Sequence, residues 1–310
     1  MKTTSYLKQA TVWFHQAFKP VKQIFESDLE RAIRKGEFVF FYQPQVDLNT
    51  GEVVGVEALL RWHHPQKGMI APAEFIPMLE RTKLINELSL FLFQQSMDDL
   101  RTLHNAGFKN LTMAVNLSAV QLEDKKLASK LEKCLKKTKI NPKLYECEIT
   151  ETAMMENMTS AVEILNEISD LGVKLSIDDF GSGYAGFNYL RRLNIQKLKM
   201  DMEFVSALFE HKNNEIILSA MMDLGHRLKL EVLAEGVETK KQEEWLIKNG
   251  CDMAQGFYFA RPMPLNDLMH FLEYELLESS KEAGEMKQHS SDIIQKKTKK
   301  TQNKHKINRD

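Results

Sequence analysis

The stretch Val173-Lys174-Leu175-Ser176-Ile177-Asp178-Asp179-Phe180-Gly181-Ser182-Gly183 joins a short apolar segment to two adjacent carboxylates and a glycine-rich turn. The apolar and β-branched residues at 173–177 predict a buried strand. Two neighbouring carboxylates raise each other's proton affinity, and a bound cation is a common way to stabilise such a pair. In the alternative interpretation, Asp179 caps a following helix and Asp178 faces water.

Strand and helix patterns alternate on both sides of this stretch. Strands are predicted at 38–43, 53–61, 111–116, 144–149, 173–177, 197–200, 230–234 and 253–259, with Pro44 stopping the first of them. Helices are predicted at 28–35, 119–137, 187–193, 240–248 and 266–277, and further helices end near residues 106, 171 and 227.

About eight strands that alternate with helices favour a (β/α)₈ barrel of the α/β class, and a doubly wound open sheet is the rival architecture. The first two strands are separated by the turn Asn49-Thr50-Gly51 rather than by a helix. Such a connection is compatible with an antiparallel pair.

The composition is that of an ordinary globular chain. Of the 310 residues, 43% are hydrophobic and 27% are charged, enough for one large domain or two modest ones. No apolar run approaches the roughly 20 residues that span a bilayer, and no secretory signal pattern begins the chain. The cysteines Cys134, Cys147 and Cys251 form no metal-binding or disulfide pattern. We therefore expect reduced thiols, no transmembrane segment and a cytoplasmic location.

Charge is distributed unevenly along the chain. The net charge is −1, but residues 281–310 contain nine Lys or Arg and only four Asp or Glu. We expect this tail to be disordered and to serve as a solvated extension rather than to form a stable nucleic-acid complex. The predicted division is an N-terminal helical or flexible segment, 1–26, a main domain, 27–278, and a basic tail, 279–310.

Most predicted strands end in side chains that can bind a metal or an anion. The active site of a barrel lies at the edge where its strands end. Five carboxylates gathered there would repel one another at a cost of several kcal/mol without cations. The residues at or just beyond strand ends are Asn116, Glu148, Glu151, Asp178, Asp179, Lys199, Asp201, Glu235, Glu238 and Gln255, with Glu57 and Arg61 late in the second strand.

These side chains favour two hard cations and chemistry on phosphate. Oxygen ligands without clustered Cys or His favour Mg²⁺ or Mn²⁺ over zinc, and Asp178 is the candidate bridge between two ions. Lys199 would lie near the attacking water, or act as a base if the ions depress its pKa; the alternative is an ion pair with Asp201. Arg61 suits bidentate binding of phosphate, and its alternative is a surface ion pair.

A set of short motifs, taken together, resembles the EAL-domain family, the cyclic-di-GMP-specific phosphodiesterases of bacteria. The resemblance runs from about Leu29 to Leu277. The motifs are Tyr42-Gln43-Pro44, Glu57-Ala58-Leu59-Leu60-Arg61-Trp62 with His64-Pro65, Val115-Asn116-Leu117-Ser118, Glu148-Ile149-Thr150-Glu151, Asp178-Asp179-Phe180-Gly181-Ser182-Gly183-Tyr184, Lys199-Met200-Asp201, Ala234-Glu235-Gly236-Val237-Glu238 and Gln255-Gly256-Phe257.

The resemblance implies a modified TIM-like barrel with one antiparallel strand, and hydrolysis of cyclic-di-GMP to linear 5′-pGpG with two Mg²⁺ or Mn²⁺ ions. It implies a homodimer formed near the 178–184 loop, and an unidentified regulatory partner is compatible with it. Ala185 and Gly186 replace two serines usual in the family. A non-hydrolysing cyclic-di-GMP receptor and a protein-interaction module on the same fold therefore remain alternatives.

The resemblance also assigns roles to individual residues. The implied metal ligands are Glu57, Asn116, Glu148, Asp178, Asp179 and Glu235. The implied catalytic residues are Lys199, Glu57, Asp179 and Glu151, the last by holding the 178–184 loop in its active shape. The residues implied to contact substrate or the ligand network are Gln43, Arg61, Asp201, Glu238 and Gln255.

Overall fold

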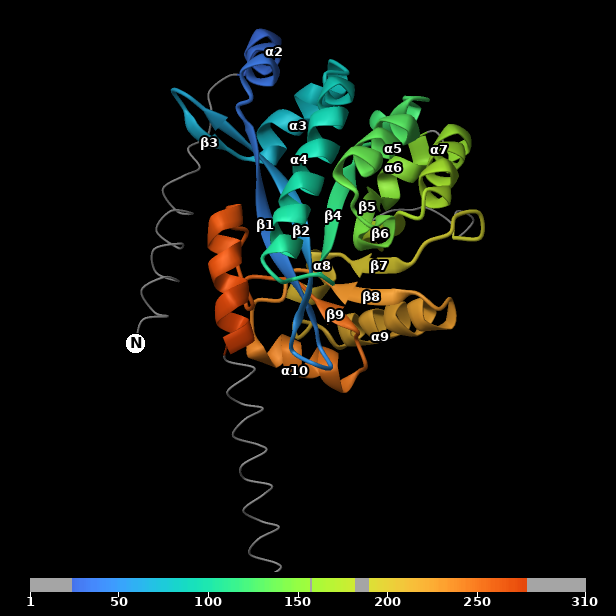
Figure 1. The fold of residues 1–310 in the computed structure, drawn as a ribbon. Helices are drawn as coiled ribbons and strands as arrows, with labels where there is room; N and C mark the ends of the chain where they lie inside the picture. The colour runs from blue at the N-terminus through green and yellow to red at the C-terminus, as the bar shows by residue number, and fades with distance from the viewer. Residues whose placement is uncertain (1–23, 157, 182–189, 278–310) are drawn as a thin grey trace, which may run out of the picture. The chain divides into compact units, whose positions relative to one another are not determined.

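The structure, a computed structural model, describes residues 24–156, 158–181 and 190–277 (Figure 1). Its strands form one sheet whose two ends meet. Strand β1 (Phe38–Asp47) pairs with β2 (Val53–His64) and also with β9 (Met253–Ala254), so the sheet closes into a barrel. In Figure 1 the first strands, in blue, lie beside the last strand, in orange.

The barrel is parallel except at β1, which runs antiparallel to both of its neighbours. Strand β3 (Gly68–Ile70) lies outside the closed ring and pairs antiparallel with β2 alone. These pairings confirm the predicted modified barrel and exclude the open sheet. The remaining strands are β4 (Thr112–Leu117), β5 (Tyr145–Thr150), β6 (Lys174–Phe180), β7 (Lys197–Met200) and β8 (Glu231–Ala234).

Helix α2 (Glu26–Lys35) precedes the first strand, and the other helices follow or connect the strands of the barrel. These other helices are α3 (Pro72–Arg81), α4 (Ile85–Asn105), α5 (Leu127–Thr138), α6 (Glu151–Glu156), α7 (Met158–Asp170), α8 (Met202–Ser206), α9 (Lys212–Arg227) and α10 (Lys240–Lys248), with short 3₁₀ helices at Gln121–Glu123 and Pro142–Leu144. A last helix, 265–277, falls almost wholly in a second compact unit that begins at Asn266. Among the described helices, none combines the length and the apolar character that crossing a membrane requires.

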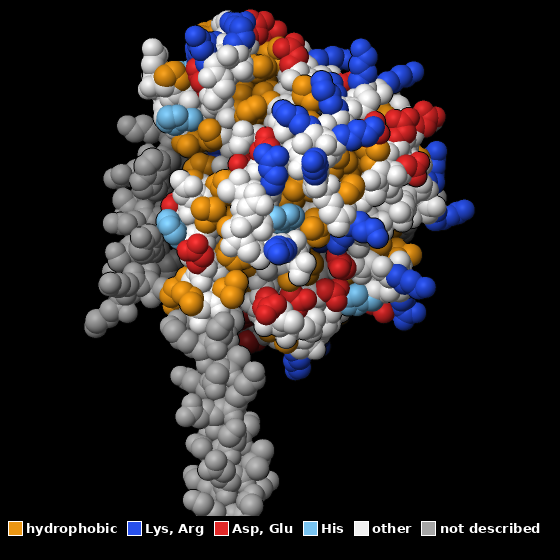
Figure 2. All heavy atoms as spheres, viewed as in Figure 1, with side chains coloured by type: hydrophobic (Ala, Val, Ile, Leu, Met, Phe, Trp, Pro, Cys, Tyr) orange, Lys and Arg blue, Asp and Glu red, His pale blue; other side chains and the backbone are white. Residues whose placement is uncertain are grey.

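Charged side chains cover much of the outer face. On the face that Figure 2 shows, Lys and Arg side chains are spread over the surface rather than gathered into one patch. The helices present these residues outward because their apolar faces pack on the barrel. For example, α5 buries Leu127, Leu131 and Leu135 and exposes Lys136 and Lys137.

Pro44 does not end the first strand, contrary to prediction. It lies inside β1, opposite Val56 of β2. Tyr42, two residues earlier, exchanges both of its backbone hydrogen bonds with Met263 on the side away from β2. Because backbone direction alternates with a period of two, the nitrogen of Pro44 also faces away from β2, so its missing N–H costs the β1–β2 ladder nothing.

Several other boundaries also differ from prediction. The second strand continues to His64, beyond its predicted end at residue 61, and turns back through β3. The helix expected at 119–137 begins only at Leu127, after a 3₁₀ turn. The last strand is confined to Met253 and Ala254, because Gly256 enters a turn against Val237. Of the helix expected at 187–193, residues 190–193 form a turn and bend, and the rest lies outside the described residues.

The predicted segments 1–26 and 279–310 fall almost entirely outside the described residues, so the division into three parts stays a prediction. All three cysteines are free and buried. Burial raises the pKa of the Cys147 thiol above its ordinary value. These cysteines are therefore inert parts of the core.

An aromatic cluster lies where β1 and β2 meet α3. The ring centroid of Phe38 lies 5.5 Å from that of Phe75 and 5.8 Å from that of Trp62. Phe75 and Trp62 meet edge to face at 5.9 Å, and the indole N–H of Trp62 donates to Glu37 at 3.0 Å. All three rings are almost completely buried.

Phe75→Ala should lower the free energy of unfolding by about 3–5 kcal/mol, because it leaves a cavity beside the buried rings of Phe38 and Trp62. Urea unfolding followed by far-UV circular dichroism measures this change. The matched control is Phe25→Ala: Phe25 is 55% exposed, and its removal should cost less than about 0.5 kcal/mol. Equal losses for the two variants would contradict the assignment of Phe75 to the core.

Candidate active site

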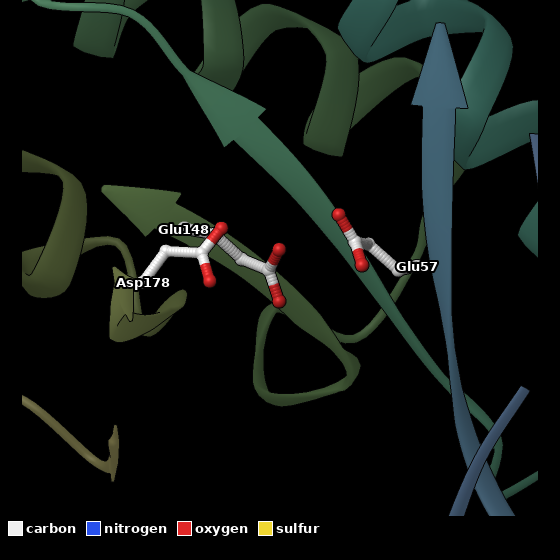
Figure 3. A group of neighbouring side chains, drawn as sticks. All are labelled: Glu57, Glu148 and Asp178. Atoms are coloured by element: carbon white, nitrogen blue, oxygen red, sulfur yellow. The ribbon is translucent and has the colours of Figure 1, made fainter. Parts of the chain in front are cut away.

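The parallel strands bring their polar ends to one edge of the barrel. Side chains alternate along a strand, so each strand delivers an inward residue near its carboxyl end. Glu57 lies on β2, Glu148 on β5 and Asp178 on β6, and Figure 3 shows their carboxylates turned toward a common space. Glu235 directly follows β8. The structure therefore brings together four carboxylates that the sequence separates widely.

The Lys199 ammonium lies in the middle of these carboxylates. Its Nζ atom is 2.8 Å from Glu148 Oε2, 2.8 Å from Glu235 Oε1, 3.0 Å from Asp178 Oδ1 and 3.6 Å from Glu57 Oε2. The Lys199 side chain is completely buried. Lys199 therefore does not pair with Asp201, which was the alternative that the sequence left open.

One lysine cannot balance four acidic groups. Burial would lower the pKa of Lys199, but the surrounding carboxylates raise it well above its ordinary value, so Lys199 carries its charge. Burial together with the neighbouring carboxylates raises the pKa of Glu148 and of Glu235, against the opposite effect of Lys199. For Glu57, burial is outweighed by Lys199 and by amide hydrogen bonds, which lower its pKa. Lys199 thus leaves part of the negative charge of the four carboxylates uncompensated, and protons or cations can bind there.

Asp178 belongs to two groups of carboxylates. The ligand atoms of Glu57, Glu148 and Asp178 lie within 4.8 Å of one another, and those of Asp178, Asp179 and Glu235 do so as well. A carboxylate common to two such groups could serve a pair of divalent ions.

Asp179 reaches the same site because the backbone leaves the extended conformation. Neighbouring side chains of a regular strand point to opposite faces, yet Asp179 has a φ of 53°, in the left-handed region. The β6–β7 register is irregular at this point, between Ile177 and Phe180. Burial and the carboxylates of Asp178 and Asp201 raise the pKa of Asp179 to about 6. The strained turn thus places a second acidic group beside Asp178.

Amide side chains hold Glu57 in place. Asn116 Nδ2 donates to Glu57 Oε1 at 2.7 Å, and Gln255 Nε2 donates to Glu57 Oε2 at 2.6 Å. Gln255 Nε2 also donates to Gln43 Oε1 at 3.1 Å, and Gln43 Nε2 donates to the carbonyl of Ala260 at 3.1 Å. Gln43 and Gln255 therefore form a chain of amide hydrogen bonds that ends on Glu57.

Gly256 lets Gln255 occupy this position. A Cβ atom on Gly256 would lie 2.1 Å from the carbonyl oxygen of Val237 and 2.3 Å from its nitrogen. Only glycine allows the two backbones to approach so closely. This approach brings the turn after β9 against the loop that follows Glu235.

Arg61 is buried near the site rather than exposed in a surface ion pair. Its Nη1 donates to the carbonyl of Leu60 at 2.9 Å, and its guanidinium carbon lies 5.8 Å from the Phe41 ring centroid. Its Nε is buried and has no hydrogen-bond partner among the described residues. Burial lowers the pKa of Arg61 to about 10, while Glu57 acts in the opposite direction. A charged group with an unused donor is suited to an anionic ligand.

Three residues that the motifs assign to the active site lie outside the carboxylate cluster. Glu151 is buried at the start of α6, and its Oε2 accepts a hydrogen bond from the backbone N–H of Gly181 at 3.1 Å. Asp201 caps α8 by accepting from Glu203 N at 2.8 Å. Glu238 is exposed and belongs to neither carboxylate group. Glu151 thus contacts the start of the 178–184 loop, whose later residues are not among those described.

A second buried ion pair, between Lys197 and Glu146, was not predicted from the sequence. The Lys197 Nζ donates to Glu146 Oε2 at 2.8 Å and to Gln45 Oε1 at 3.2 Å. A signal was present, because Lys197 precedes Lys199 by two residues and Glu146 precedes Glu148 by two. That spacing places both members of each pair on the inward face of a strand.

Comparison with known proteins agrees with this architecture. The family model of the EAL domain matches residues 26–262. The bifunctional diguanylate cyclase/cyclic di-GMP phosphodiesterase MucR of Pseudomonas aeruginosa is 38% identical over 242 residues, which are 78% of this chain and 35% of MucR. The cyclic di-GMP phosphodiesterase NbdA of the same organism is 38% identical over 247 residues, 80% of this chain and 32% of NbdA. The chain thus spans about a third of the length of these relatives.

Solved structures share the fold. The PaMucR phosphodiesterase in complex with c-di-GMP superposes with a TM-score of 0.75 at 38% identity, covering 78% of this chain and 98% of that one. The EAL enzyme Bd1971, in its form with bound cAMP and cyclic-di-GMP, gives a TM-score of 0.76 at 30% identity, covering 80% of this chain and 68% of that one. By the match to most of its length and by these relatives, the chain belongs to the EAL domain family.

Proposed function

We propose that this protein hydrolyses cyclic-di-GMP to linear 5′-pGpG with the help of two divalent cations, Mg²⁺ or Mn²⁺. The oxygen of a water molecule forms a bond to one phosphorus atom, and the bond from that phosphorus to O3′ breaks. The O3′ atom takes up a proton, and the phosphate stays on the 5′ side of the linear product.

The observation that carries this proposal is the position of Asp178 in both carboxylate groups. The donor set consists of oxygens, which favours hard cations over zinc. Glu148 Oε1 is buried without a hydrogen-bond partner among the described residues, and a carboxylate oxygen left in that state is costly unless a cation binds it. Asn116 donates to Glu57 through its nitrogen, so this bond does not use its amide oxygen.

Six residues would hold the cations: Glu57, Asn116, Glu148, Asp178, Asp179 and Glu235. When bound, such ions lower the pKa of water and neutralise charge on the phosphate. The tight amide network around Glu57 keeps that ligand in one orientation, as partners of metal ligands commonly do.

Lys199 acts as a fixed positive charge rather than as a base. The surrounding carboxylates raise its pKa, and its ammonium donates a hydrogen bond to Glu148 Oε2. We propose that it holds the attacking water oxygen and stabilises the negative charge that develops there.

Arg61 and the amide pair Gln43–Gln255 orient the substrate. The buried guanidinium of Arg61 has a donor without a protein partner and suits one phosphate. Glu151 would hold the turn at Gly181 and so keep Asp178 and Asp179 in place. Asp201 and Glu238 would contact the substrate from the rim of the site, as their motifs suggest.

The named relatives support the choice of substrate. MucR and NbdA are named cyclic di-GMP phosphodiesterases, and PaMucR is described in complex with c-di-GMP. Because the chain spans about a third of each named relative, the activity of the whole protein is part of this proposal. A homodimer, a regulatory partner and a cytoplasmic location stay predictions.

Turnover and its dependence on metal test the proposal directly. The purified protein, incubated with cyclic-di-GMP and Mn²⁺, should form 5′-pGpG, which anion-exchange chromatography separates from the substrate. Chelation with EDTA should stop turnover, and renewed addition of Mn²⁺ should restore it, because the carboxylates need the cations. Tight binding of cyclic-di-GMP without any linear product would instead identify a receptor, and absence of binding would point to a protein-interaction module.

Glu148→Gln should lower kcat about 100-fold and weaken Mn²⁺ binding at least about tenfold, since even the loss of an outer partner of a ligand costs about 10–100-fold. Steady-state kinetics and titration calorimetry measure these changes. Glu244→Gln is the matched control, because Glu244 is 64% exposed in a surface ion pair, and it should behave as wild type. A Glu148→Gln variant with wild-type turnover would rule out Glu148 as a ligand.

Lys199→Met should lower kcat about 100-fold, the usual effect of losing a donor that stabilises developing charge. Mn²⁺ binding should not weaken, because Lys199 occupies carboxylate oxygens that a cation would otherwise use. Lys240→Met removes an exposed lysine from a surface pair and should change neither value. If Lys199→Met keeps the wild-type kcat, Lys199 has no role in the reaction.

A further inference from the structure

A second polar layer lies in the barrel interior, two residues earlier on the strands that carry Lys199 and Glu148. Lys197 Nζ is 2.8 Å from Glu146 Oε2, and both side chains are almost fully buried. Gln45 Oε1, from β1, lies 3.2 Å from the same nitrogen. The reaction proposed above uses none of these three residues.

Small residues on neighbouring strands make room for this layer. A Cβ atom on Gly55 of β2 would lie 3.0 Å from Gln45 Oε1 and 2.4 Å from Thr112 Oγ1, so any larger residue would push Gln45 away. Ser176 of β6 stands in register with Lys197 of β7. The space is therefore built to admit the two long side chains of Lys197 and Glu146.

The two layers present the same pair of charges twice. On β5 the carboxylates are Glu146 and Glu148, and on β7 the ammonium groups are Lys197 and Lys199. In the observed pairing, Lys197 contacts Glu146 while Lys199 contacts Glu148. Lys197 is the sole cation that holds Glu146 among the described residues, and Glu146 Oε1 has no hydrogen-bond partner there. A buried carboxylate in this state draws any cation within reach.

Lys199 is the next cation on the same strand. Side chains two residues apart on a strand point to the same face and lie about 6.6 Å apart, so the ammonium of Lys199 lies one layer from Glu146. Without Lys197, the pairing of Lys199 with Glu146 would become the favourable alternative.

We propose that Lys197 is a positioning residue: by holding Glu146, it keeps the ammonium of Lys199 in the upper layer among Glu148, Asp178 and Glu235. This inference rests on the proposed function, in which Lys199 acts on the attacking water. When Lys197 is absent, Lys199 moves toward Glu146 and leaves the carboxylates that would hold the cations. Loss of Lys197 then weakens catalysis while it frees the metal site of a competing charge.

The test compares Lys197→Met with the double variant Lys197→Met/Glu146→Gln. In the double variant, residue 146 no longer carries the negative charge that would attract Lys199. Protein stripped of metal is titrated with Mn²⁺ by calorimetry, and kcat and KM are measured for cyclic-di-GMP. We expect Lys197→Met to lower kcat at least tenfold, to change KM less than threefold and to bind Mn²⁺ at least threefold more tightly. The double variant should return both kcat and Mn²⁺ affinity to within threefold of wild type.

Lys130→Met is the matched control, since it removes a lysine from a 2.8 Å ion pair with Asp124 outside the barrel, and it should leave both values unchanged. If Lys197→Met does not yield folded protein, Lys197→Gln, which keeps a donor toward Glu146, should shift both values in the same directions at least twofold.

Wild-type kcat and Mn²⁺ affinity in the single variant would overturn the inference. Failure of the double variant to recover would do so as well, because the pair would then contribute only to the barrel's stability. If the wild type itself forms no product, the proposed function fails, but tighter Mn²⁺ binding in Lys197→Met and its reversal in the double variant still decide where Lys199 is held.

Discussion

The site depends on one buried ammonium group that is surrounded by four carboxylates. Lys199 lies within 3.0 Å of Glu148, Asp178 and Glu235 and within 3.6 Å of Glu57. Without a positive charge, these acids could not share so small a volume, because like charges in a poorly solvated interior repel strongly. One lysine offsets only part of their charge. The same arrangement that lets the chain fold therefore leaves it with an affinity for further cations.

The barrel makes this concentration of charge possible. Closure of the sheet through β1, which pairs with both β2 and β9, brings the two ends of the main sequence together. Gln43 of β1 can then bond Gln255, which follows β9, and Gln255 can hold Glu57 of β2. A buried charge is tolerated only where its hydrogen bonds are satisfied, and this amide chain supplies them for Glu57. The polar layer of Lys197, Glu146 and Gln45 places a second buried ion pair one step further into the barrel.

Much of the fold could be predicted because strands and helices alternate with clear periods. The strand at 197–200 and the helix at 240–248 have the predicted bounds. The errors have local physical reasons. Pro44 is compatible with β1 because its nitrogen faces away from β2, and the hairpin to β3 depends on pairing between Trp62 and Ile70 that no period reveals. The final strand is short because Gly256 packs on Val237, a contact between distant residues.

The sequence by itself determined that Glu148, Asp178 and Lys199 stand near the carboxyl ends of strands, whereas Glu57 lies in the middle of β2. It also carried the motifs of the EAL domain family, which the matched residues 26–262 bear out. Only the tertiary structure decided the charge pairing: Lys199 meets four carboxylates rather than Asp201, and Lys197 meets Glu146. The left-handed backbone conformation of Asp179, with a φ of 53°, also could not be predicted from the sequence. Sequence period fixes the face on which a side chain lies, whereas the curvature and closure of the sheet decide which distant charges come within a few ångströms.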